Sequence, residues 1–227
     1  MQPARSDSFS QSNSIGLHHE ENQDSYLVDD QNLLFAVADG VGGYSGAKEA
    51  SSIAIDLLAR SATRISDENS LAQCIREIHD AILRRSMKLR FPNMGTTLGV
   101  TKILPGKEQA IIGNVGDSPI FLFRGSSLDS VYEDDSHRSR DPLSMFGIVQ
   151  YLGLECELNI HTRALPYLHG DVLLLCSDGI TDNLLNSKGG KERLASLIKS
   201  GSARNIVRSA LEEGLKPDDM TALLVFL

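Results

Sequence analysis

Short apolar or alternating runs recur along the chain and predict a series of β-strands. β-Branched and aromatic residues are frequent in these runs, and turn residues such as Pro105-Gly106 and Arg124-Gly125 separate several of them. The runs lie at Leu33–Ala38, Thr96–Ile103, Ala110–Val115, Ile120–Phe123, Val172–Cys176 and Thr221–Leu227. Because short turns join consecutive strands, the pattern favours antiparallel pairing over a parallel sheet.

Two longer segments carry apolar residues at helical spacing instead. The first follows Ser45, the expected N-cap, and the second ends before Pro92. Two shorter helices are expected between Lys191 and Glu213. The long apolar faces comprise Ala47, Ala50, Ile53, Ala54, Leu57 and Leu58, and then Leu71, Cys74, Ile75, Ile78, Ala81 and Ile82. No repeat or flexible linker divides the chain, so we expect one α+β domain over residues 1–227, with helices packed outside antiparallel sheets.

The composition is that of an ordinary globular protein, with 41% hydrophobic and 23% charged residues. A net charge of −8 repels a polyphosphate backbone, which argues against nucleic acid as a partner. Cys74, Cys156 and Cys176 lack CxxC spacing, as is usual for reduced thiols. The first residues lack the apolar core of a signal peptide, and no apolar run is long enough to span a bilayer. We therefore expect a soluble, cytoplasmic protein with no membrane partner.

Two of the predicted strands run into an Asp-Gly pair, Asp39-Gly40 and Asp178-Gly179. An Asp at the end of a buried strand is held rigidly but faces outward, and the Gly lets the chain turn and leaves its carbonyl accessible. Carboxylate and carbonyl oxygens are the ligands that hard divalent cations prefer. Further candidates are Asp218 beside Asp219, Asp117 and Asp24. A single Asp-Gly is more often only a turn, so the residues alone leave a turn and a divalent-metal site both open.

The motifs taken together resemble the metal-dependent protein phosphatases of type 2C. They occur in the family's order and span nearly the whole chain. They are Asn22-Gln23-Asp24, the run FAVADGVGG from Phe35 to Gly43, Gly95-Thr96-Thr97, Asn114-Val115-Gly116-Asp117-Ser118, the run LCSDGITD from Leu175 to Asp182, and Asp218-Asp219-Met220-Thr221.

The resemblance implies a four-layer αββα sandwich, in which two mainly antiparallel sheets pack face to face between helices. It also implies that Asp39 bridges two Mn²⁺ or Mg²⁺ ions, with the Gly40 carbonyl on one ion and with Asp178 and Asp218 on the other. Asp24 would take part directly or through water, and Asp117 matches a position associated with a third ion. Two such ions lower the pKa of a water held between them for in-line attack on phosphorus, so Asp39, Asp178 and Asp218 are the expected catalytic residues.

Four positions depart from the family pattern. His19 stands where an Arg usually grips the substrate phosphate, so we expect His19 to be a weaker, pH-sensitive anchor, unless it only caps a loop. Gln23 replaces a common Glu, which should loosen one ion, and Asp219 replaces a frequent Asn, which adds a charge that partly compensates. Pro119 replaces an Arg, and its missing N–H predicts a strand at the sheet edge.

The region after this strand is short for the flap that the family carries there, with only about 133–153 available. Its densely charged part, Glu133–Asp141, is expected to be an exposed loop. A short flap would leave the cleft more open.

The leading interpretation is a bacterial-type serine/threonine phosphoprotein phosphatase that acts on a phosphorylated protein and is paired with a cognate Ser/Thr kinase. An alternative is a phosphatase-like signalling or binding module with weakened catalysis, which His19, Gln23 and the flap favour and the intact aspartates oppose. A two-metal phosphodiesterase or nuclease would share the carboxylates but conflicts with the acidic surface. The sequence leaves the oligomeric state open.

Overall fold

The computed structural model describes residues 4–12, 21–41, 46–137 and 147–227. Within these residues the strands form two five-stranded antiparallel sheets and one short two-stranded ribbon. The first sheet has the order β1-β12-β11-β6-β7, with β1 at Arg5–Ser12, β6 at Ile120–Arg124, β7 at Ser127–Ser130, β11 at Val172–Cys176 and β12 at Asp219–Phe226. The second has the order β10-β5-β4-β3-β2, with β2 at Ser25–Asp29, β3 at Leu34–Ala38, β4 at Leu98–Leu104, β5 at Gln109–Val115 and β10 at His161–Pro166. The ribbon pairs β8 (Ser136–His137) with β9 (Gly147–Ile148).

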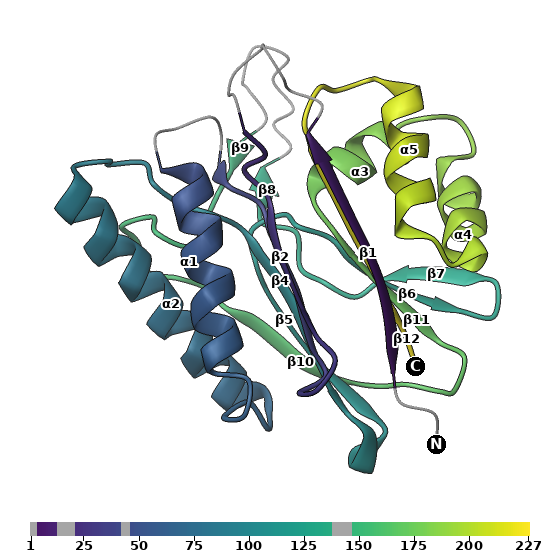
Figure 1. The fold of residues 1–227 in the computed structure, drawn as a ribbon, viewed down its shortest axis with the longest axis horizontal. Helices are drawn as coiled ribbons and strands as arrows, with labels where there is room; N and C mark the ends of the chain where they lie inside the picture. Colours follow the sequence, from purple (N-terminus) through teal and green to yellow (C-terminus); the bar gives the residue numbers. More distant parts are fainter. Residues whose placement is uncertain (1–3, 13–20, 42–45, 138–146) are drawn as a thin grey trace.

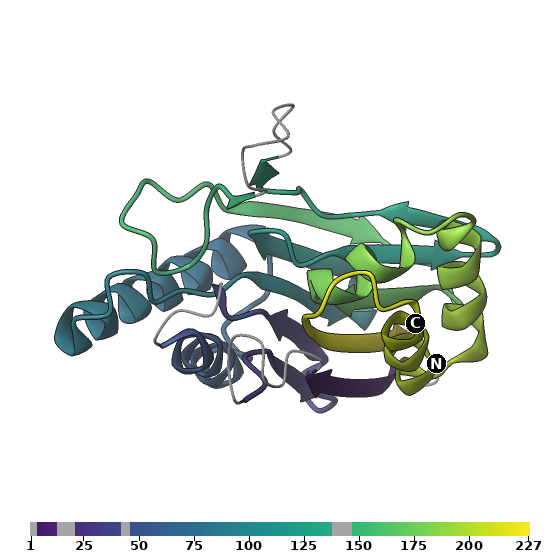
Figure 2. The same cartoon turned by 90° about the horizontal axis from the view of Figure 1, so that it is seen from above.

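Helices cover the outer face of each sheet. The long helices α1 (Ala47–Arg60) and α2 (Glu68–Leu89) pack on the second sheet. The shorter helices α3 (Asp178–Leu184), α4 (Gly190–Ser200) and α5 (Ala203–Glu213) pack on the first. Figure 1 shows the resulting layers from left to right as helices, sheet, sheet and helices, and Figure 2 shows the two helical layers on opposite sides from above. The four-layer αββα sandwich is therefore confirmed.

The central strands are buried on both faces, which explains why their sequences are continuously apolar rather than alternating. In β11, Leu173 and Leu175 point between the two sheets, whereas Leu174 and Cys176 point beneath the C-terminal helices. In β3, Phe35 belongs to the layer between the sheets. Each fully buried side chain of this size contributes about 1.5–3 kcal/mol, so these strands hold the site's framework rigidly.

The six predicted strands and four predicted helices are all present, with ends shifted by one or two residues in most cases. The N-cap of α1 is Gly46 rather than the predicted Ser45, which lies outside the described residues. The prediction of an edge strand after Pro119 is wrong, because β6 lies between β11 and β7. Pro119 precedes the first residue of β6, and its carbonyl accepts a hydrogen bond from the Cys176 N–H at 3.0 Å. Proline lacks an N–H but has a carbonyl group, and it is this carbonyl that pairs with the neighbouring strand β11 at this interior position.

Two further observations concern the cysteines and the helices. All three cysteines lie in the described part of the chain and are free thiols, with Cys74 and Cys176 buried and Cys156 exposed. Among the residues that the structure describes, no helix has the length and apolar character needed to cross a membrane.

Candidate active site

The candidate site lies at the end of the sandwich where β3 and β11 end and where β2 and β12 begin. Ser25 pairs with Ala38 in one sheet, and Cys176 pairs with Ala222 in the other. Figure 1 draws this end uppermost. Motifs that are far apart in the sequence therefore meet at one end of the molecule.

The glycine after each aspartate lies where the backbone packs closely against another element. A Cβ on Gly40 would lie 2.8 Å from backbone atoms of Ala47, and one on Gly179 would lie 2.2 Å from the Asp219 carbonyl oxygen. Neither glycine has a positive φ, so close packing, and not a left-handed backbone conformation, is what requires a residue without a side chain here. The missing side chains let the start of α1 approach the end of β3, and the start of α3 approach the start of β12.

Asp24 is buried and is held by hydroxyl groups of the opposite sheet. Its Oδ2 accepts hydrogen bonds from Ser177 Oγ at 2.8 Å and Thr221 Oγ1 at 2.6 Å. Its Oδ1 is also buried but has no hydrogen-bond partner among the described residues. Burial raises the pKa of Asp24 to about 7, with the charges of Asp219 and Asp218 adding to the rise against the two hydroxyl donors. A fixed carboxylate with one unused buried oxygen is an arrangement suited to binding a cation.

Asp39 is fixed through its backbone by two threonines of the Gly95-Thr96-Thr97 motif. Its N–H donates to Thr97 Oγ1 at 3.0 Å, and its carbonyl accepts from Thr96 Oγ1 and from the Thr97 N–H, both at 2.8 Å. Burial raises the pKa of Asp39 well above its ordinary value, and four neighbouring carboxylates raise it further: Asp24, Asp178, Asp218 and Asp117. The five predicted acidic residues therefore form one cluster with Asp39 among them.

Asp117 lies in the loop between β5 and β6, close to Asp134 and Asp135. Burial and the charge of Asp178 raise the pKa of Asp117 to about 7. The preceding Gly116 N–H donates to Asp135 Oδ2 at 2.9 Å, and Asp135 also contacts Gln150 Nε2 at 2.7 Å and His161 Nε2 at 3.0 Å. Asp135 thus ties the loop that carries Asp117 to Gln150 and His161.

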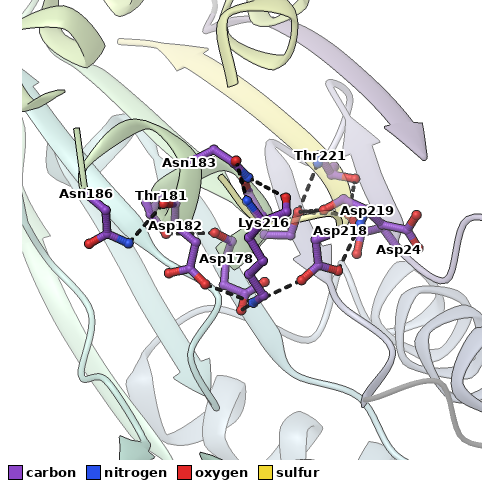
Figure 3. A network of polar contacts seen from close by, with 12 residues as sticks. Asp24, Asp178, Thr181, Asp182, Asn183, Asn186, Lys216, Asp218, Asp219 and Thr221 are labelled. Atoms are coloured by element: carbon purple, nitrogen blue, oxygen red, sulfur yellow. Dashed lines mark hydrogen bonds and ion pairs between the residues drawn. The ribbon is translucent and has the colours of Figure 1, made fainter. Parts of the chain in front are cut away.

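A lysine occupies the other side of the cluster (Figure 3). Lys216 Nζ lies 2.9 Å from Asp178 Oδ2, 2.8 Å from Asp182 Oδ2 and 3.0 Å from Asp218 Oδ2. Although burial lowers the pKa of Lys216, the charges of Asp178 and Asp218 outweigh it and raise that pKa above its ordinary value. Lys216 therefore remains a cation in the midst of two of the predicted metal ligands.

The donor set fits divalent cations, with one obstacle. In favour are the unpartnered Asp24 Oδ1 and the mutual repulsion of the clustered carboxylates, which a cation would relieve. Yet within the described ranges no three Asp, Glu, His or Cys side chains converge as a ready-made metal site. Lys216 contacts Asp178 and Asp218, and this contact is a physical reason why their carboxylates do not form such a site.

The structure also locates the residues at which the sequence departs from the family pattern. His19 lies outside the described residues. The Gln23 N–H donates to Asp219 Oδ2 at 2.7 Å, so the additional carboxylate holds the backbone next to Asp24. Sequence reasoning missed Lys216, although it lies only two positions before Asp218, because its acidic partners Asp178 and Asp182 come from a distant helix.

Comparisons with known proteins agree with the geometry. The family model described as protein phosphatase 2C matches residues 17–216. The serine/threonine phosphatase stp of Listeria welshimeri is 31% identical over 188 residues, covering 73% of each chain. The stp of Listeria monocytogenes is 28% identical over 231 residues, covering 92% of this chain and 90% of that one.

Two solved structures share the fold over almost the whole chain. PppA of Pseudomonas aeruginosa superposes with a TM-score of 0.80 at 26% identity, covering 99% of this chain and 98% of that one. The catalytic domain of PstP, in complex with two manganese ions, gives a TM-score of 0.79 at 25% identity, covering 98% and 97%. The chain therefore belongs to the protein phosphatase 2C family and is a protein-serine/threonine phosphatase.

Proposed function

We propose that the chain hydrolyses phosphoserine and phosphothreonine esters on proteins, using divalent cations held by the clustered aspartates. The observation that carries this proposal is that Asp24, Asp39, Asp117, Asp178 and Asp218 all lie at one end of the sandwich, near enough for their charges to interact. Clustered, partly buried carboxylates are costly unless cations offset their charge, so the cluster is best explained by a role in binding cations.

The resemblance to the family suggests a role for each of these residues. Asp39 would bridge two ions. The Gly40 carbonyl would bind one of them, and Asp178 and Asp218 would bind the other. Asp24 would offer its Oδ1, and Asp117 would hold a third ion. When bound, Mn²⁺ or Mg²⁺ supplies an activated water and neutralises charge on the phosphoryl oxygens. PstP, whose structure contains two manganese ions, supports the choice of Mn²⁺.

The chain's own groups hold these ligands in position. Ser177 and Thr221 fix Asp24 from the opposite sheet, and Thr96 and Thr97 fix the backbone of Asp39. Cys176 lies close by but is fully buried, and burial raises the pKa of its thiol. It therefore stays a thiol and is not a nucleophile, which is consistent with direct attack by water.

Substrate recognition would involve residues beyond the cluster. His19 remains the proposed anchor for the substrate phosphate, and the segment 133–153 would form a shortened flap in a single domain of residues 1–227. The substrate would be a phosphorylated protein, and a cognate Ser/Thr kinase would be the partner enzyme of this phosphatase.

The proposal is tested by turnover of p-nitrophenyl phosphate and of a phosphothreonine peptide with added Mn²⁺. We expect turnover that EDTA abolishes and that Asp39→Asn lowers by at least about a hundredfold, since an essential ion would lose its bridging ligand. No turnover at any Mn²⁺ concentration would favour the non-catalytic module. Preferential cleavage of bis-p-nitrophenyl phosphate would favour a phosphodiesterase.

A further inference from the structure

The ammonium group of Lys216 has the surroundings of a bound cation. Its three N–H donors match three carboxylate oxygens, one each from Asp178, Asp182 and Asp218, all within 3.0 Å. Figure 3 shows the Lys216 side chain extended toward these carboxylates. The Lys216 side chain is 43% exposed, so the ammonium group lies at the open side of the cluster and can leave it without unfolding the core.

The backbone of Lys216 is anchored, so this placement does not depend on a flexible loop alone. The Lys216 N–H donates to Asn183 Oδ1 at 2.9 Å, and the Lys216 carbonyl accepts from Asn183 Nδ2 at 3.0 Å. Asn183 is fully buried and also donates to the Gly179 carbonyl at 2.8 Å. Asn183 therefore joins α3 to the segment before β12, which keeps Lys216 next to Asp178 and Asp182.

A divalent ion between Asp178 and Asp218 would use the same oxygen atoms at about 2.0–2.6 Å. The ion and the ammonium group cannot both occupy that space, and their like charges repel each other. We propose that Lys216 is an internal cation that occupies the Asp178–Asp218 half of the site and must be displaced by an ion that binds there. The inference rests on the proposed metal-dependent function.

Lys216 then has opposite effects on the two states of the protein. In the metal-free state its single positive charge offsets part of the negative charge of three carboxylates and stabilises the fold. In the loaded state its ion pairs have been broken and its charge lies close to the ion. Metal binding has to break three partly exposed ion pairs, and we expect this cost to weaken the metal affinity by about tenfold.

The experiment is Mn²⁺ binding by isothermal titration calorimetry on the full chain after dialysis against EDTA. We expect the wild type to bind one ion more tightly than the other. Lys216→Met should lower the Kd of the weaker ion by about tenfold, because no cation then has to be displaced. Lys216→Gln provides a second neutral variant should the methionine variant fail to fold. Lys188→Met removes the same charge from an exposed position and should leave both Kd values unchanged.

Thermal unfolding gives a readout that is independent of activity. In EDTA the Lys216 variants should melt below the wild type, and saturating Mn²⁺ should raise their Tm by more than it raises that of the wild type. An unchanged or weakened Mn²⁺ affinity in both neutral variants would overturn the inference. If Asp39→Asn still removes Mn²⁺ binding in that case, the proposed function stands. If neither wild type nor variant binds Mn²⁺, both fail.

Discussion

Asn183 offers a direct test of how the site is held together. Its buried side chain forms hydrogen bonds with the Gly179 carbonyl and with both backbone groups of Lys216. Asn183→Ala removes all three. At about 1 kcal/mol for each hydrogen bond, the free energy of unfolding should fall by about 3 kcal/mol. For a domain of this size that corresponds to a drop in Tm of about 6–12 °C.

The matched control is Asn186→Ala. Asn186 also donates from Nδ2 to a backbone carbonyl of α3, that of Asp182 at 2.9 Å, but it is exposed. Water can replace that hydrogen bond, so the expected loss is below about 0.5 kcal/mol.

Urea unfolding followed by far-ultraviolet circular dichroism in EDTA measures both effects without a contribution from metal. The midpoint should fall for Asn183→Ala while the slope stays constant, which shows that stability rather than the extent of unfolding has changed. Equal midpoint shifts in the two variants would refute the view that Asn183 joins α3 to the segment before β12.

Two further predictions concern packing and pH. Gly179→Ala places a Cβ 2.2 Å from the Asp219 carbonyl oxygen, so it should lower the free energy of unfolding by about 1–3 kcal/mol and reduce turnover. The control Gly106→Ala should do neither, because nothing lies within 4 Å of a Cβ at that position. Equal melting curves for the two variants would contradict this prediction. His79 is buried and its Nδ1 accepts from the Gly153 N–H at 3.3 Å, and burial lowers its pKa. Because the unfolded chain then binds the proton more readily, His79 should cost stability as pH falls below about 6.5, by up to about 1.4 kcal/mol at pH 5.5. The stability difference between wild type and His79→Gln should shift by that amount between pH 7.5 and 5.5, and a constant difference would exclude this role.

The central strands could be predicted because burial on both faces leaves a continuous apolar run. The edge strands could not. β1 has the sequence RSDSFSQS, and β10 ends in Pro166, so neither carries the apolar signal that marks a buried strand. β1 is specified instead by its partner, since it pairs with β12 along its whole length. The helix α3 was also missed, because it has only seven residues and contains Gly179, Thr181 and Asn183, which are poor helix formers.

The acidic cluster could be predicted because each aspartate lies in a motif with a recognisable local pattern. Lys216 could not, because a lysine near the end of the chain is usually a solvated surface residue. Its position among the carboxylates depends on the contact between α3 and the segment before β12, which only the tertiary structure provides. The role of Asp219 could not be predicted either. Its carboxylate accepts a hydrogen bond from the Gln23 N–H, and this contact forms only because the two sheets pack against each other.

Asp24 and Asp39 flank strands β2 and β3 of one sheet, whereas Ser177 and Asp178 follow β11 of the other sheet, in which Thr221 belongs to β12. An ion shared by Asp39 and Asp178 would therefore cross-link two halves of the sandwich, much as a disulfide does. The two residues are about 140 positions apart, and closing a loop of this order restricts the unfolded chain by roughly 4–5 kcal/mol in the loop-entropy model. Metal depletion would then loosen the docking of the two sheets as well as stop the reaction, so the supply of metal would govern how long the protein persists.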